Sequence, residues 1–172
     1  MENNAQKSNL ADFVAKYPLL IMNLEKISVL TLIIGLILYF LEVKDTGFIL
    51  VIGAILTAIT YFLSAFQIVE IETLETTGIL NTIGFINFVY KLTYLGLSIA
   101  ILASVGLVIK TAPTSTLVNV SGLTLVIVLI LSILTKINDR SKIYGISYYS
   151  RLIPCLLLLF YLANIQYHWI LN

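Results

Sequence analysis

Residues 27–69 read ISVLTLIIGLILYFLEVKDTGFILVIGAILTAITYFLSAFQIV, and this stretch decides the fold. Two apolar runs, residues 27–41 and 48–69, flank the polar turn EVKDTG at residues 42–47. Apolar runs approaching or exceeding about 18 residues are typical of membrane-spanning helices. Because the turn is short, we expect the two helices to be antiparallel neighbours, which makes this stretch a transmembrane hairpin.

The first run is short for a membrane span. Its 15 residues would extend about 22 Å along a helix, whereas the hydrocarbon core of a bilayer is about 30 Å thick. We therefore expect the charged residues that flank it, Glu25 and Lys26 among them, to extend their charged ends toward water while their stems lie along the helix.

The rest of the chain has the same apolar character. Of its 172 residues, 59% are hydrophobic and only 11% are charged, and the mean hydropathy is +1.01. In soluble domains about a quarter of the residues are charged. Further apolar runs lie at residues 92–109, 117–134 and 152–171. These features predict an all-α, polytopic membrane protein: five transmembrane helices in a bundle, forming a single transmembrane domain over residues 27–172.

Polar and amphipathic segments separate the predicted spans. Residues 1–26 are expected to form a polar tail and an interfacial amphipathic helix, which Pro18 ends or bends. Residues 70–91 are expected to form a surface segment, in which residues 79–90 make either a second surface helix or a long extension of the helix that follows. The predicted order then continues with a second hairpin at 92–135, a basic loop at 136–151 and a fifth helix at 152–171, with Pro154 in its first turn. Tyr144, Tyr148 and Tyr149 predict an aromatic belt at a membrane face.

Lysine and arginine are divided unevenly between the two ends of the predicted helices. With the N-terminus in the cytoplasm, the cytoplasmic segments hold eight basic residues, namely Lys7, Lys16, Lys26, Lys91, Lys136, Arg140, Lys142 and Arg151. The other face holds Lys44 and Lys110. Under the positive-inside rule this predicts an inner (plasma) membrane protein with its N-terminus cytoplasmic and its C-terminus outside. The prediction requires that Lys91 lies outside the third span and that the last segment crosses.

Small residues recur at four-residue spacing on two of the predicted helices. On the second helix they are Gly53 and Thr57, with Ala54 and Ala58 beside them. On the third they are Gly96, Ala100 and Ser104. In lipid, small residues let helix backbones approach closely. We expect these residues to serve helix packing, either between the second and third helices of one chain or between two copies of the chain.

The polar residues within the predicted spans are uncharged, which argues against catalysis and coupled transport. They are Thr31, Thr57, Thr60, Ser64, Ser98, Ser104, Thr124, Ser132 and Asn164. The chain has one histidine, His168, and one cysteine, Cys155, so a site built from several histidines or several cysteines is excluded by count, and we expect His168 to lie at the interface beside Trp169. We therefore predict that the protein is not an enzyme, and we expect no catalytic residues, no cofactor and no metal.

The charged residues outside the predicted spans indicate which kinds of partner the protein could bind. The net charge is +1 and there is no dense basic run, so we expect no binding of nucleic acid. Glu70, Glu72 and Glu75 lie in a stretch without basic residues, where they could meet the basic patch of a partner or form a solvated loop.

One part of the chain is similar to a known family. The end of the second apolar run, Tyr61-Phe62-Leu63-Ser64-Ala65-Phe66, preceded by Gly53 and a short turn, resembles the membrane hairpin of the L-type stator proteins of gliding motility and type IX secretion. In that family an acidic residue on the second helix couples proton flow to rotation, and Thr57 occupies the aligned position. The resemblance implies a bacterial protein that has the hairpin without the coupling acid.

These features together predict a non-catalytic membrane scaffold or accessory subunit. Its partners would be the lipid bilayer and either a second copy of the chain or a larger membrane complex. The alternative is a small transporter or pore for a neutral or apolar solute, lined by Thr57, Thr60, Ser98 and Ser104.

Overall fold

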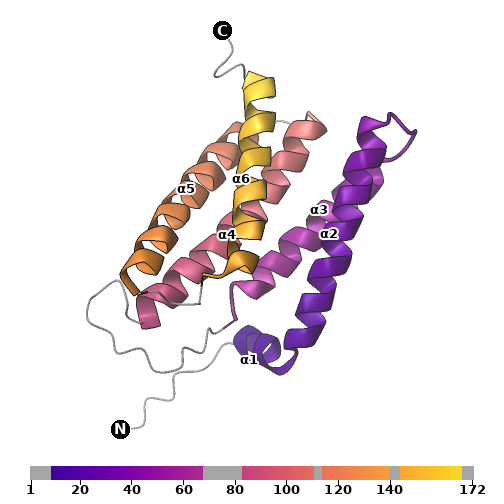
Figure 1. Cartoon of the computed structure of the whole chain (residues 1–172). Helices are drawn as coiled ribbons and strands as arrows, with labels where there is room; N and C mark the ends of the chain where they lie inside the picture. The colour runs from indigo at the N-terminus through magenta and orange to yellow at the C-terminus, as the bar shows by residue number, and fades with distance from the viewer. Residues whose placement is uncertain (1–8, 68–82, 111–113, 140–143, 168–172) are drawn as a thin grey trace.

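The computed structural model describes residues 9–67, 83–110, 114–139 and 144–167, and the regular structure within these ranges is helical. Figure 1 shows α2 and α3 as one pair of long helices beside α4, α5 and α6, with the short α1 at one end of that pair. The helices are α1 (Asn9–Lys16), α2 (Pro18–Phe40), α3 (Gly47–Ser64), α4 (Ile83–Val108), α5 (Thr114–Asp139) and α6 (Ile146–Tyr167).

Four of these helices, α2 to α5, are long and apolar enough to cross a membrane. The all-helical, membrane character predicted from the sequence is therefore confirmed. The apolar part of α6, Ile146–Tyr161, is shorter. Among the described residues, four candidate spans rather than five are present, and the fifth crossing stays a prediction.

The first span begins earlier than predicted. Helix α2 starts at Pro18 rather than at residue 27, and it has 23 residues rather than 15. Proline suits the first turn of a helix, because its fixed φ is helical and its missing N–H would have no partner there. The predicted boundary between residues 26 and 27 is therefore corrected: Glu25 and Lys26 lie inside helix α2, within the candidate span Pro18–Phe40.

Three further boundaries differ from the predictions. Helix α4 runs without interruption from Ile83, so the described part of the predicted surface segment is an extension of the span and Lys91 lies inside a helix. Helix α5 continues to Asp139 and α6 begins at Ile146, which shortens the predicted loop at 136–151. Pro154 consequently lies in the interior of α6 rather than in its first turn.

Helix α4 is the centre of the bundle. It packs against α3, α5 and α6, whereas α2 packs against α3 and α1. In an apolar window of 18 residues, 72% of the α4 residues are buried, against 17% of those of α2. The buried residues of α2 are Ile21, Ser28 and Gly35, one every seven positions, which makes a narrow seam. Most of the α2 surface is therefore left for lipid or for another protein.

Successive long helices run in opposite directions (Figure 1). The starts of α2, α4 and α6 and the ends of α3 and α5 therefore share one end of the bundle, which we call the base. Among the described basic residues, Lys44 and Lys110 lie at the opposite end. The others belong to the base and are Lys16, Lys26, Lys91, Lys136 and Arg151. Lys91 lies within the candidate span Gly84–Val108, so the requirement that it lie outside the third span is not met. The other described basic residues keep the predicted asymmetry, and which end faces the cytoplasm stays a prediction.

Candidate functional site

A charged pair joins α2 to α6 near the base. Arg151 donates through Nε to Oε1 of Glu25, and through Nη2 to Oε2 of Glu25 at 2.9 Å. The two side chains are 28% and 14% exposed, respectively. A guanidinium and a carboxylate that meet through two parallel hydrogen bonds form the strongest kind of such pair. The backbones of the described parts of α2 and α6 do not pack against each other. The two helices are therefore connected here through the long side chains of Glu25 and Arg151.

The third nitrogen of Arg151 is also engaged. Nη1 donates to the Ser147 carbonyl at 3.2 Å, to the Ser147 hydroxyl at 2.9 Å and to the Tyr94 hydroxyl at 3.4 Å. Tyr94 belongs to α4, so the guanidinium contacts the central helix as well as α2. All three side-chain nitrogens of Arg151 are hydrogen-bonded inside the protein. The side chain therefore connects α6 to both α2 and α4.

Tyr94, which contacts Arg151, belongs to a group of packed tyrosine rings that we call the tyrosine cluster. Ring centroids lie 5.8 Å apart for Tyr61 and Tyr94, 4.7 Å for Tyr90 and Tyr94, and 6.5 Å for Tyr90 and Tyr148. The Tyr90 hydroxyl donates to the Tyr94 hydroxyl at 3.3 Å, and the Thr93 and Tyr148 hydroxyls are 2.6 Å apart. The tyrosine cluster thus connects α3, α4 and α6 beside the ion pair. Its members are Tyr61, Tyr90, Tyr94, Tyr144, Tyr148 and Tyr149.

The predicted aromatic belt is therefore wrong for two of its three members. Tyr144 is fully buried and Tyr148 is 4% exposed. Helix α6 begins six residues earlier than predicted and places the Tyr148 ring beside Tyr90 of α4, while Tyr144, which precedes α6, packs against the Tyr148 ring with a centroid distance of 4.9 Å. Tyr149 is half-buried, and the Lys136 Nζ lies 5.1 Å from its ring centroid, a cation–π contact between α5 and α6.

A close crossing holds α2 to α3. A Cβ atom on Gly35 would lie 2.7 Å from the backbone of Leu50, and one on Gly53 would lie 2.7 Å from the backbone of Leu32. Real Cβ atoms do not approach backbone this closely, so both positions need glycine. Gly53 is one of the predicted packing residues, but it packs against α2, whereas the sequence favoured the helix that became α4. Its partner Gly35 was not among the predicted packing residues.

The other predicted packing residues of α3 are also buried within the chain. Ala54, Thr57 and Ala58 are at most 3% exposed. The Thr57 hydroxyl donates to the Gly53 carbonyl of its own helix at 2.7 Å. The Ser98 hydroxyl of α4 donates to the Ala58 carbonyl at 2.8 Å, which connects α3 to α4. These residues are therefore buried by contacts inside one chain.

The small residues of α4 face a different helix. A Cβ atom on Gly96 would lie 3.1 Å from the side chains of Leu125 and Thr124, so Gly96 packs against α5. Ala100 is fully buried, and Ser104 is 4% exposed, with no hydrogen-bond partner for its hydroxyl in the described part of the chain. The predicted partner residues Glu70, Glu72 and Glu75 lie outside the described residues.

Replacing Ser98 by alanine is expected to lower the free energy of unfolding by about 0.6 kcal/mol, the average value of a hydrogen bond between membrane helices. The change removes the bond to Ala58 and leaves the helix backbone intact. Thr31→Val is the matched control, because the Thr31 hydroxyl bonds to a carbonyl of its own helix. Thermal unfolding in mild detergent measures both, and equal losses for the two variants would contradict the role given to Ser98.

Sequence reasoning missed the ion pair. Glu25 and Arg151 were each assigned to a membrane boundary, yet the positive-inside topology already put both at the same end of the bundle, near the starts of two helices. Two opposite charges in that position are the signal that could have paired them. Tyr94 carried no such signal, because a tyrosine near a predicted span end is expected at the interface.

Comparison of the chain with protein-family models, with curated proteins and with solved structures found no match. The resemblance of residues 27–69 to the stator hairpin therefore stays a prediction. The described structure is a helical bundle. The ion pair of Glu25 and Arg151 and the glycines Gly35 and Gly53 hold its helices together.

Proposed function

We propose that this chain is a non-catalytic, multi-pass membrane scaffold or accessory subunit of a membrane complex. In this proposal α6 is a fifth crossing, the base faces the cytoplasm of a bacterial cell, and the C-terminus lies outside the inner membrane. The observation that carries the proposal is the division of α2 into a narrow buried seam and a broad apolar face.

The apolar face of α2 is suited to a partner helix. In a bilayer there is little hydrophobic drive between helices, so an apolar helix surface accepts lipid tails or a complementary helix according to the packing. The exposed face runs along the whole length of α2. Its large side chains are Leu19, Leu20, Met22, Leu24, Ile27, Leu30, Ile33, Ile34, Ile37 and Phe40.

The use of polar groups in the interior also supports a structural role. The Thr57 and Thr60 hydroxyls donate to carbonyls of α3 itself, and that of Ser98 connects two helices. The paired charges of Glu25 and Arg151 likewise connect helices. These groups contribute to holding the bundle in one arrangement, which a scaffold requires.

Crosslinking from the α2 face tests the proposal. In a Cys155→Ala background, a cysteine replaces Ile34 on α2 or Ile127 on α5. The two positions are matched, because Ile34 is 44% exposed and Ile127 is 42% exposed. A thiol-reactive photocrosslinker is attached to each variant in native membranes, and the products are separated by mass.

We expect the Ile34→Cys variant to give a discrete adduct of higher mass, either with a second copy or with one other protein, and the Ile127→Cys variant to give much less of it. A chain that stays a lone monomer in mild detergent and yields no protein adduct from Ile34 would overturn the scaffold proposal.

A further inference from the structure

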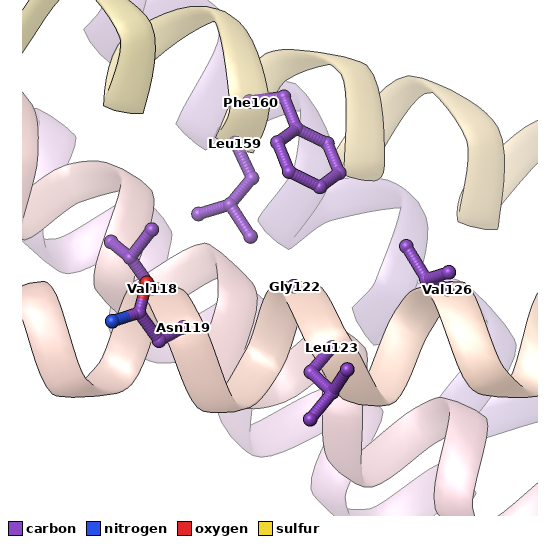
Figure 2. Close-up of a pocket in the computed structure, with 7 residues that line it drawn as sticks. All are labelled: Val118, Asn119, Gly122, Leu123, Val126, Leu159 and Phe160. Atoms are coloured by element: carbon purple, nitrogen blue, oxygen red, sulfur yellow. The ribbon is translucent and has the colours of Figure 1, made fainter. Parts of the chain in front are cut away.

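An apolar groove lies between α5 and α6, on a side of the bundle away from α2. It has a volume of about 380 Å³ and is lined by residues of both helices. Figure 2 shows Leu159 and Phe160 extending from α6 toward α5, with Gly122 between the side chains that α5 contributes. The lining residues are Val118, Asn119, Gly122, Leu123, Val126, Leu159 and Phe160.

The groove is narrow and runs along α5. Its lining residues on α5 extend from Val118 to Val126, a distance of about 12 Å along the helix axis. The volume therefore corresponds to an average cross-section of about 30 Å². A helix with side chains is about 10–12 Å wide and has a cross-section of about 80–110 Å². A second helix is too wide for this groove, whereas a single hydrocarbon chain is not.

The polarity of the groove changes along its length. Among the described residues that line the groove, Asn119 is the one with a polar side chain, and it is exposed. It lies near the start of the candidate span Thr116–Lys136, at the end of the bundle opposite the base. The apolar residues Leu123 and Val126 lie further along the span. An amide at the membrane boundary above an apolar channel matches an amphiphile with a polar head and a hydrocarbon tail.

From these observations we propose that the groove between α5 and α6 binds one acyl chain of a bilayer phospholipid. The chain lies along α5 beside Gly122 and beneath Phe160, and the Asn119 amide hydrogen-bonds to the ester or phosphate oxygens of the same lipid. Gly122 contributes no side chain to the groove, and a Cβ there would be in ordinary van der Waals contact with the side chains of Leu159 and Phe160, at 3.7 and 3.9 Å.

Photolabelling in vesicles tests the site. The full chain is reconstituted in vesicles of phosphatidylethanolamine and phosphatidylglycerol that contain a small fraction of a phospholipid with a diazirine in its acyl chain. After illumination, the labelled residues are identified by mass spectrometry of the digested protein. We expect labelling to concentrate on residues 118–126, 159 and 160 rather than to follow exposure alone.

Two tryptophan variants provide the comparison. Leu123 lies on the rim of the groove and is 64% exposed, while Leu157 of α6 is 63% exposed and does not line it. Leu123→Trp is expected to reduce labelling of the groove about fivefold, which corresponds to ~1 kcal/mol of binding free energy. Leu157→Trp should leave it unchanged. Both changes are at exposed positions, so the fold is expected to be kept.

Asn119→Leu tests the polar end separately. Loss of one hydrogen bond in the membrane is expected to reduce groove labelling about threefold. The proposal is overturned if labelling is spread evenly over the exposed faces of the bundle, or if Leu123→Trp and Leu157→Trp behave alike. It is also overturned if the groove residues crosslink to a second copy of the chain instead of to lipid.

Discussion

Replacing Gly35 by alanine is expected to lower the free energy of unfolding by about 1–3 kcal/mol, the usual cost of inserting a methyl group into a packed interior. The new Cβ would lie 2.7 Å from the backbone of Leu50, so α2 and α3 would have to move apart. Gly53→Ala should have a similar effect, because it would clash with the backbone of Leu32 at the same distance. Thermal unfolding in mild detergent measures both losses.

The control for this prediction is Gly84→Ala. Gly84 lies in α4, and a Cβ there would have no neighbour within 4 Å among the described residues. Alanine favours a helix over glycine by about 1 kcal/mol in water, so this variant should be neutral or slightly more stable. If Gly35→Ala were as stable as Gly84→Ala, the close crossing of α2 and α3 would be wrong.

Removing one partner of the ion pair is expected to have the second large effect. In Glu25→Ala, the guanidinium of Arg151 would lose its carboxylate while remaining partly buried. Breaking a fully buried pair costs about 3–5 kcal/mol, and the partial exposure of these side chains reduces the expected loss to about 2–3 kcal/mol. The measurement is again thermal unfolding in mild detergent, supported by limited proteolysis in native membranes.

A neighbouring residue supplies the control. Lys26→Ala removes an exposed charge from the position next to Glu25 and should change stability by less than about 0.5 kcal/mol. The double variant Glu25→Leu with Arg151→Met removes both charges and should be more stable than Glu25→Ala, because it leaves no unpaired charge. A Glu25→Ala variant as stable as Lys26→Ala would contradict a structural role for the pair.

Composition and periodicity were sufficient to predict the helical membrane class and the antiparallel hairpin of α2 and α3. Both follow from properties of short segments: the length of an apolar run and the length of a turn. Helix boundaries were harder to predict from the sequence. A proline such as Pro18 can either end one helix or begin the next, and the apolar pattern does not distinguish these two roles. The extension of α4 to Ile83 was likewise left as one of two alternatives.

The contacts between helices were only partly predictable. The spacing of Gly53, Ala54, Thr57 and Ala58 correctly marks a packed face of α3, but spacing does not say which helix covers it. The predicted topology places Glu25 and Arg151 at the same end of the bundle, which makes a pair between them possible. Whether the two side chains meet depends on the tilt and separation of whole helices, which no local pattern encodes.

Exchanging the charges of Glu25 and Arg151 is the most direct test of the ion pair that connects α2 to α6. The variants are Glu25→Arg, Arg151→Glu and the two combined, each measured by thermal unfolding in the same detergent. The singles place like charges together and should both be strongly destabilised, while the combined variant should recover most of the lost stability. A combined variant no more stable than the worse single variant would contradict the pairing of Glu25 with Arg151.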